Sequence, residues 1–146
     1  KTRNYKMKKK ILVVVANYYK DISTDLTIQV KDVLLKNGLK NNLLAVPGVF
    51  EIPVTIARNI NSYDAFIALG CIIRGETPHF DVISSEVSRG LGAVARALEI
   101  PLLFGVLTTD TQEQAWARAS REAGNKGLDL AWSALHMIAL YDALES

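Results

Sequence analysis

Ile11-Leu12-Val13-Val14-Val15-Ala16 is the stretch that decides the fold. All six residues are apolar and most are β-branched, which is typical of a strand that is buried on both faces of a parallel sheet. A helix is predicted over residues 23–37, because apolar residues such as Leu26, Val30 and Val33 recur there at helical spacing. A strand followed by a crossover helix is the repeating unit of a parallel α/β sheet.

The boundaries of the predicted helices carry local signals. Asp21 or Ser23 is expected to cap the start of the first helix, and Gly38 suits the left-handed conformation at its end. Asp110 and Glu113 resemble a capping pair in front of a later helix. These signals divide the chain into short elements with short connections.

Strands and helices continue to alternate along the rest of the chain. Further strands are predicted over residues 43–46, 65–73 and 102–107, and further helices over residues 53–60, 80–98, 113–123 and 129–144. Each strand is followed by a helix, so the sequence predicts an α/β fold: a four-stranded parallel sheet between helices on both faces, a three-layer α/β/α sandwich. No repeat or linker interrupts the pattern, and residues 11–146 are expected to form one domain.

The net charge of +2 hides an uneven distribution of charged residues. Six basic residues and no acidic one stand among residues 1–10: Lys1, Arg3, Lys6, Lys8, Lys9 and Lys10. Removing these six from the 17 basic residues leaves 11 against 15 acidic ones, so residues 11–146 carry a formal charge of −4. We interpret residues 1–10 as a solvated basic tail and expect no nucleic-acid partner, since no aromatic platform or recognition motif accompanies it.

The composition excludes several classes of protein. The longest apolar runs are far too short to cross a membrane, so no membrane partner is expected. A single cysteine, Cys71, excludes an internal disulfide and favours a reducing, cytoplasmic compartment. Two distant histidines and one cysteine make a poor metal site, and the glycine-rich phosphate and dinucleotide fingerprints are missing.

A ligand site is expected beyond the carboxyl ends of the strands, as in other open α/β sheets. That rule selects residues 17–19, 46–51, 71–79 and 108–110, which hold aromatic rings, a carboxylate, an arginine, a histidine and hydroxyl groups. Such a set suits a flat polar heterocycle together with an anion. His79 is the candidate acid–base group, because an imidazole can take and give a proton near neutral pH, although a structural histidine at a helix start fits equally well.

Several other candidate residues allow both a purely structural interpretation and a functional one. Thr77-Pro78 at a helix entry suits a phosphate seat, since the first helical amides are unpaired, but also suits a plain helix cap. Arg118 and Lys126, taken alone, are typical surface charges, and Phe104 is typical of a core. Tyr18 either stacks on a ring or covers the sheet edge.

Four motifs together resemble the lumazine synthase family. They are VPGVFEIP (residues 46–53), ALGCIIRGETPHFD (68–81), FGVLTT (104–109) and AGNKG (123–127). Their order and spacing match, and the resemblance covers nearly everything after residue 10. It implies a flavodoxin-like fold and an enzyme, a transferase without cofactor or metal, that joins 5-amino-6-(D-ribitylamino)uracil to 3,4-dihydroxy-2-butanone 4-phosphate. The products implied are 6,7-dimethyl-8-ribityllumazine, phosphate and water, in the penultimate step of riboflavin biosynthesis.

The resemblance also implies roles for individual residues. His79 corresponds to the proton-transfer histidine, Asp129 to the acidic residue near it, and Arg118 to the arginine that clamps the phosphate. The remaining positions that the resemblance assigns to the substrates are Asn17, Tyr18, Gly48, Val49, Phe50, Glu51, Cys71, Ile72, Ile73, Phe104 and Lys126, with Glu76 and Thr77 at the phosphate. Tyr18 departs from the phenylalanine or tryptophan that is usual, and Glu76 brings a carboxylate close to the phosphate seat.

An assembly follows from the same resemblance. The family takes Phe104, Arg118 and Lys126 from an adjacent subunit, which places the active site between the protomers of a pentamer. The short connection of residues 124–127 is similar to that of members that build shells of 60 subunits. Association with riboflavin synthase is a further expectation for this chain.

Two alternatives belong to other functional classes. The chain could be a non-catalytic flavin or lumazine carrier, or a purely structural shell protein. The joint presence of His79 and Arg118 favours an enzyme, because a carrier has no need of a phosphate clamp. A signalling receiver domain also fits the α/β pattern, but Ala16-Asn17-Tyr18 stands where its acidic cluster is expected.

Overall fold

A computed structural model describes residues 9–145 of the chain. In chain order the elements are β1 (Lys10–Ala16), α1 (Lys20–Lys36), β2 (Lys40–Val46), the 3₁₀ turn η1 (Val49–Glu51), α2 (Ile52–Arg58), the 3₁₀ turn η2 (Ile60–Ser62), β3 (Ala65–Ile73), α3 (His79–Leu98), β4 (Leu102–Thr109), α4 (Gln112–Ala119) and α5 (Lys126–Glu145). The expected alternation of strands and helices is confirmed.

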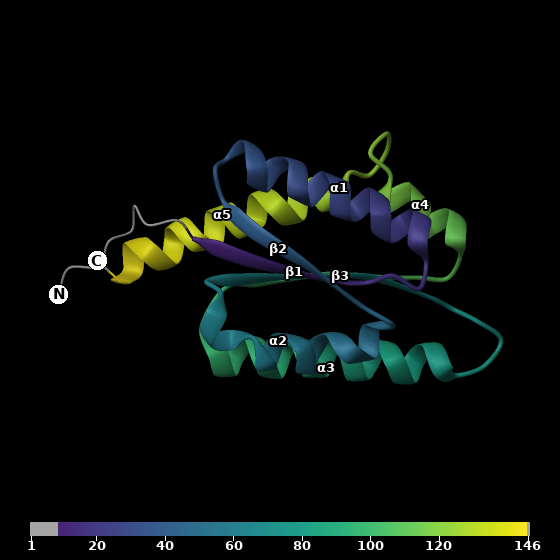
Figure 1. Cartoon of the computed structure of the whole chain (residues 1–146). Coiled ribbons are helices and arrows are strands. Elements are labelled where there is room, and N and C mark those ends of the chain that lie inside the picture. Colours follow the sequence, from purple (N-terminus) through teal and green to yellow (C-terminus); the bar gives the residue numbers. More distant parts are fainter. Residues whose placement is uncertain (1–8, 146) are drawn as a thin grey trace.

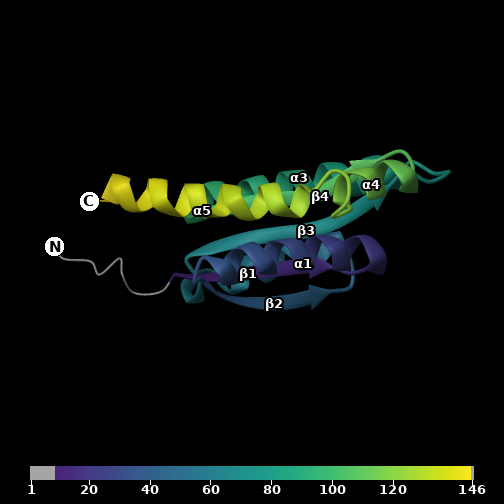
Figure 2. The same cartoon turned by 90° about the horizontal axis from the view of Figure 1, so that it is seen from above.

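The described residues form one four-stranded sheet in the order β2-β1-β3-β4. All of its pairings are parallel, and Val13 of β1 lies between Leu43 of β2 and Ile67 of β3. The strands are seen from above in Figure 2. The first strand, β1, lies inside the sheet. After the edge strand β2 the chain crosses back past β1 to form β3 and then β4, which is the flavodoxin-like arrangement. This confirms the predicted fold class.

Helices cover both faces of the sheet and create two hydrophobic cores. Alternate residues of β1, such as Ile11 and Val13, pack into the core with α1, α4 and α5, whereas Leu12 and Val14 pack with α2 and α3. Figure 1 shows these two helical layers above and below the sheet. Since side chains alternate between the faces of a strand, both sets must be apolar, which explains the unbroken run in β1.

The edge strand β2 differs from the two central strands, β1 and β3. β2 begins at Lys40, three residues before the predicted strand, and nearly all of its side chains are exposed or half-buried. Asn41 and Asn42 pair with β1 through their backbones, so their polar side chains gave no strand signal.

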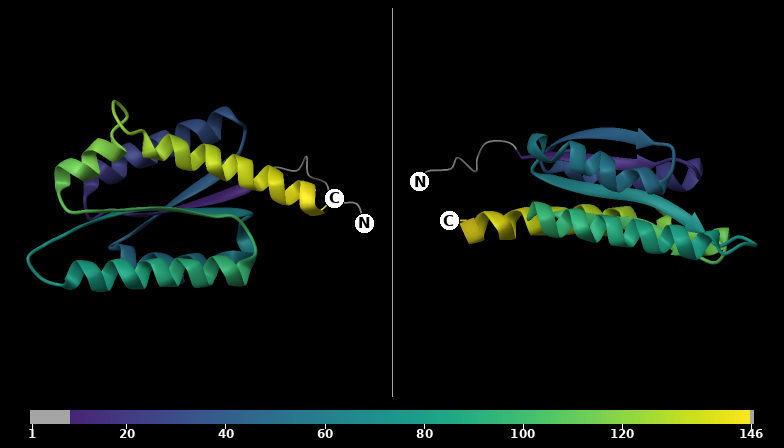
Figure 3. Two further views of the ribbon diagram at one scale, coloured as in Figure 1. Left: turned by 180° about the vertical axis from the view of Figure 1, so that it is seen from behind. Right: turned by 90° about the horizontal axis from the view of Figure 1, so that it is seen from below.

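Seen from behind in Figure 3, α5 runs on past the end of the sheet.

Two of the predicted helix caps are wrong. α1 begins after Tyr19 without a side-chain cap, and the Ser23 hydroxyl instead donates to the backbone oxygens of Ala16 and Tyr19, at 2.9 and 3.0 Å. In front of α4, Thr111 and Gln114 form the capping box that was expected of Asp110 and Glu113. The expectation for Gly38 is confirmed, with a φ of 71° after the end of α1.

The connection between α4 and α5 is longer than predicted. α4 ends at Ala119, four residues early, and α5 begins at Lys126, three residues early. Gly124 lies so close to the end of α4 that a Cβ atom would collide with the backbone oxygens of Ala117 and Arg118. The glycine therefore permits a tight reversal of the chain at this point.

The predicted basic tail falls mainly on residues 1–8, which lie outside the described residues. Lys10 already belongs to β1, and its backbone N–H donates to the Asp64 carboxylate at 2.8 Å. Lys9 forms an ion pair with Asp142 at 3.0 Å. No helix within residues 9–145 is long and apolar enough to span a lipid bilayer.

Candidate active site

A pocket of about 510 Å³ lies beyond the carboxyl ends of β1 and β3, where the sheet topology predicts a ligand site. We call it the strand-end pocket. Its lining residues are Tyr18, Tyr19, Gly48, Val49, Phe50, Cys71, Ile72, Ile73, His79 and Ile83. Eight of these were predicted from the sequence. Tyr19 lies in the predicted segment 17–19 but was given no role of its own, and Ile83 was missed, since an apolar residue in a helix carries no separate signal.

The walls of the strand-end pocket are apolar and its mouth is aromatic. Val49 and Ile72 are buried, whereas the rings of Tyr18 and Phe50 are largely exposed, at 76% and 59%. The rings of Tyr18 and Tyr19 meet edge to face, with centroids 5.0 Å apart. Exposed rings above a preformed apolar wall suit a flat heterocycle that stacks on one side.

A glycine allows the pocket wall to form. A Cβ atom on Gly70 of β3 would approach the Cγ1 atom of Val49 to 2.7 Å, closer than side chains tolerate. The missing side chain lets η1 lie directly against the sheet. Val49 and Phe50, from a segment far away in the sequence, thus stand beside Cys71 and Ile72 at the end of β3.

Cys71 forms part of the buried wall. Its side chain is 6% exposed, and burial raises the pKa of the thiol to about 11. An apolar environment disfavours the thiolate, so the thiol stays protonated near neutral pH. Cys71 therefore acts as a small apolar wall residue and lacks the character of a nucleophile.

His79 is the first residue of α3 and borders the strand-end pocket. Its backbone N–H makes a long hydrogen bond of 3.4 Å to the Thr77 hydroxyl, and its own side chain is exposed. The first turn of α3 lies at the same place, and the positive end of its helix dipole favours a nearby anion. Glu76 and Thr77 are exposed in the loop before α3 and do not line the pocket.

Asn17 and Glu51 flank the strand-end pocket without lining it. The Asn17 backbone N–H donates to the Val46 oxygen at 3.3 Å, which extends the β1–β2 pairing. Glu51 is half-buried at the end of η1.

A second pocket, of about 390 Å³, lies along β4, the outer strand of the sheet. We call it the edge pocket. Its lining residues are Phe104, Gly105, Val106, Leu107, Thr108, Arg118 and Lys126. The structure thus brings Phe104, Arg118 and Lys126 together in one pocket, which His79 does not line. The two pockets share no lining residue.

The edge pocket is cationic. The Arg118 guanidinium donates to the Gln114 backbone oxygen of its own helix at 3.0 Å, and no carboxylate among the described residues forms an ion pair with it. Lys126 is exposed at the start of α5. Two positive side chains beside a helix start make this pocket a suitable place for an anion.

Asp129 does not stand beside His79 within one chain. It is exposed in the first turn of α5 and lines neither pocket. Its helix begins at Lys126, a residue of the edge pocket. Within residues 9–145, no group of His, Cys, Asp and Glu side chains has an arrangement that could hold a metal ion.

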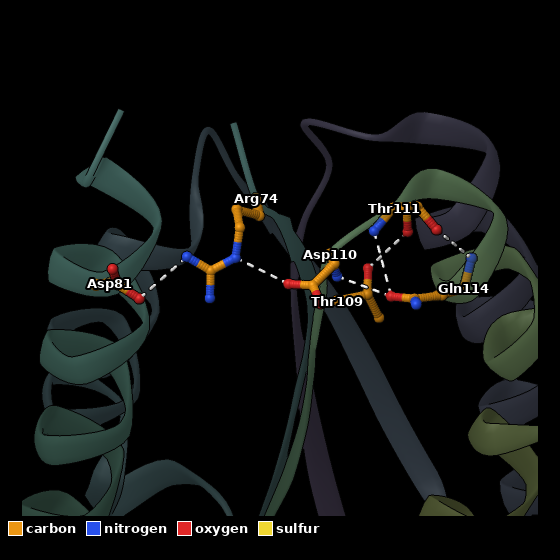
Figure 4. Close-up of polar contacts among 6 residues, drawn as sticks. All are labelled: Arg74, Asp81, Thr109, Asp110, Thr111 and Gln114. Carbon is orange, nitrogen blue, oxygen red and sulfur yellow. Dashed lines mark hydrogen bonds and ion pairs between the residues drawn. The ribbon is translucent and has the colours of Figure 1, made fainter. Parts of the chain in front are cut away.

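An arginine bridge, drawn in Figure 4, braces the loop in front of α3. The Nε atom of Arg74 contacts Asp110 at 2.8 Å, and its Nη1 atom lies 3.5 Å from Asp81. The guanidinium also lies 4.4 Å from the centre of the Phe80 ring, and the hydrogen bond to Asp110 raises the pKa of Arg74. This bridge ties the start of α3 to the end of β4, and no local sequence pattern predicts the pairing.

Comparisons with known proteins identify the family. A family model described as 6,7-dimethyl-8-ribityllumazine synthase matches residues 8–142. The 6,7-dimethyl-8-ribityllumazine synthase of Desulfotalea psychrophila is 45% identical over 143 residues, which cover 94% of this chain and 92% of that protein.

Two solved structures that are similar to this chain have low TM-scores. A de novo designed Rossmann fold protein has a TM-score of 0.40 and 13% identity over 73% of this chain and 90% of its own. A flavodoxin from the domain Archaea has a TM-score of 0.40 and 8% identity over 87% of this chain and 99% of its own. The strand order, rather than these scores, defines the fold. The match over nearly the whole length and the 45% identity show that the chain belongs to the 6,7-dimethyl-8-ribityllumazine synthase family.

Proposed function

We propose that this chain catalyses the condensation of 5-amino-6-(D-ribitylamino)uracil with 3,4-dihydroxy-2-butanone 4-phosphate, the penultimate step of riboflavin biosynthesis. The products are 6,7-dimethyl-8-ribityllumazine, inorganic phosphate and two water molecules. The observation that carries the proposal is the family match over residues 8–142. The strand-end pocket adds chemical support, because its aromatic mouth and apolar wall suit a pyrimidine ring.

The two pockets divide the binding of the substrates between them. In the strand-end pocket, the pyrimidine stacks on Tyr18, and η1 with Glu51 faces the hydroxyl groups of the ribityl chain. In the edge pocket, Arg118 grips the phosphate with its two-pronged guanidinium, which a lysine cannot reproduce. Lys126 adds a second positive charge, and the backbone amides near Thr77 supply further donors. The Glu76 side chain then points away from the phosphate.

The reaction needs positioning and proton transfer more than a protein nucleophile. The amino group of the pyrimidine attacks the ketone, and loss of water gives an imine. Phosphate then leaves, the resulting enol becomes a ketone, and ring closure with loss of a second water gives the lumazine. His79 at the pocket wall serves as the group that moves protons between these steps. Because the nucleophile belongs to the substrate, much of the acceleration comes from holding two substrates together.

We propose that a complete active site forms only between neighbouring copies of the chain. Within one chain, the edge pocket lies on the outer strand β4 and shares no residue with the strand-end pocket. If the edge pocket of one subunit closes over the strand-end pocket of the next, Arg118 faces His79 and Asp129 lies near that histidine. An interface between two different surfaces repeats around a closed ring, as in a pentamer.

The proposal also covers the larger assembly of subunits and the cellular location of the protein. We expect pentamers, with a shell of 60 subunits and association with riboflavin synthase as further steps. A cytoplasmic location suits a chain with a single buried thiol, since such a chain has no disulfide to form.

The test of the proposed function is the absorbance of the lumazine product after the protein is mixed with both substrates. A reaction without protein is the control, because the two compounds combine slowly unaided. We expect the protein to accelerate product formation. Tight binding of a ribityllumazine or flavin without acceleration would instead establish a carrier, the second candidate function.

A further inference from the structure

Two polar side chains are buried in the apolar face of α1. Asp25 is 7% exposed and Gln29 is 5% exposed, among neighbours such as Ile22, Leu26 and Val30 that pack against the sheet. Burying a carboxylate or an amide costs free energy unless its hydrogen bonds are restored within the protein. The partners of these two side chains therefore indicate what they are for.

Both side chains bind the connection between α4 and α5. The Gln29 amide donates from its Nε2 atom to the Ala119 oxygen at 2.6 Å, and its Oε1 atom accepts from the Leu128 backbone N–H at 3.1 Å. Asp25 accepts from the Arg121 backbone N–H at 2.9 Å and pairs with the Arg121 Nε atom at 3.1 Å. Gln29 thus holds both ends of the connection, and Asp25 holds a residue between them.

A glycine keeps the connection against α1. A Cβ atom on Gly127 would come within 2.7 Å of the Leu26 backbone oxygen and within 2.9 Å of two Gln29 side-chain atoms. The first turn of α5 can approach α1 this closely only without a side chain there. Backbone packing and the Gln29 hydrogen bonds therefore fasten the same few residues.

The segment that α1 holds in place, residues 118–128, carries the two cations of the edge pocket. Arg118 stands immediately before Ala119, the residue whose oxygen Gln29 binds. Lys126 stands immediately before Gly127 and two residues before Leu128, the other Gln29 partner. A shift of this segment would therefore move both cations, although no hydrogen bond or ion pair joins either cation to Asp25 or Gln29.

We propose that Asp25 and Gln29 are positioning residues, which hold Arg118 and Lys126 in the geometry that binds the phosphate of the second substrate. This inference rests on the proposed function, because it assigns the phosphate to the edge pocket. The pyrimidine site lies on other elements and does not depend on this fastening. The two substrates should therefore respond differently when it is removed.

The decisive variant is Gln29→Met, which keeps the length and approximate volume of the side chain and removes both hydrogen bonds. We expect the KM for the butanone phosphate to rise about tenfold, the effect of weakening a charge-assisted contact, with little change in the KM for the pyrimidine. Inorganic phosphate binding, measured by calorimetry, should weaken by a similar factor. Asp25→Asn keeps an acceptor for the Arg121 N–H and should show a smaller effect than Asp25→Ala.

Val33→Ala is the matched control, because Val33 is 3% exposed on the same face of α1 and contacts the core without a hydrogen bond to the connection. It should lower the melting temperature and leave both KM values unchanged. In an Arg118→Ala background, Gln29→Met should cause little further rise in KM, since the group that it positions is already missing. This non-additivity separates positioning from general stability.

Two outcomes would overturn the proposal: unchanged phosphate binding in Gln29→Met, or equal rises in both KM values. If the unsubstituted protein formed no product, the proposed function would fail. Calorimetry with inorganic phosphate would still decide whether Gln29 controls the edge pocket.

Discussion

The strand-end pocket and the edge pocket are built by different means. The first has buried apolar walls that the central strands fix in place, and its polar groups stand at the rim. The second is an exposed, cationic hollow on an outer strand, and its charges sit at the two ends of the connection between α4 and α5. The difference fits the proposed division of substrate binding, in which one pocket would recognise a ring by shape and the other an anion by charge.

This division has a consequence for catalysis. A ring held by an apolar wall and an anion held by a forked cation define the relative position of two substrates, which is the main requirement of a reaction that brings its own nucleophile. Replacing the group that binds the phosphate should therefore slow the reaction more than replacing the group that transfers protons.

Replacing Arg118 with alanine should have the largest effect on activity. We expect kcat/KM for the butanone phosphate to fall by about 10³-fold, the loss of two charge-assisted hydrogen bonds. Arg118→Lys keeps the charge without the fork and should recover only part of the activity. Steady-state kinetics with each substrate varied in turn measures both. A loss of pyrimidine affinity equal to the loss for the phosphate substrate would contradict the division between the pockets.

Replacing His79 with alanine should have a smaller effect. Acid–base catalysis at its low end contributes about 10²-fold, and we expect kcat to fall by that factor or less. The KM for the butanone phosphate should change little, because the proposed function assigns most of the phosphate contacts to the edge pocket. Single-turnover rates at saturating substrate provide the measurement. A fall in kcat larger than that caused by Arg118→Ala would show that proton transfer, and not positioning, dominates.

The thiol of Cys71 offers a test of the apolar wall. Its raised pKa, about 11, means that the thiolate forms only as the pH rises towards that value. Alkylation by iodoacetamide at pH 8 should therefore be at least about tenfold slower than for an exposed cysteine, and its rate should keep rising above pH 9. Bound ribityllumazine should slow it further. A rate that levels off near pH 8.5 would contradict a buried, desolvated wall.

Much of the fold could be predicted because burial leaves a pattern in the sequence. The run from Ile11 to Ala16 is apolar at every position, since each face of β1 meets its own core. The polar start of β2 escaped prediction, because an edge strand needs only backbone pairing. The capping box of Thr111 and Gln114 was misplaced by one residue, a shift that local composition does not resolve.

The candidate site could be predicted in part for a similar reason. Most residues of the strand-end pocket lie at or soon after the carboxyl ends of strands, and the sheet topology brings them together. The hydrogen bonds of Gln29 and the bridge of Arg74 join residues far apart in the sequence, and no local pattern announces them. The separation of Arg118 from His79 also depends on the fold, because only the strand order shows that β4 lies at the edge.

The most direct test of the central claim, a site completed by a neighbouring copy, mixes two variants that each have low activity alone. His79→Ala and Arg118→Ala subunits are co-expressed in equal amounts, and lumazine formation is compared with that of each variant alone. If the site lies between subunits arranged head to tail in a ring, about one quarter of the interfaces in the mixture hold an intact His79 and an intact Arg118. We therefore predict activity near one quarter of that of the unsubstituted protein. Activity no higher than the average of the two variants would contradict a shared site and place both residues in the site of a single chain.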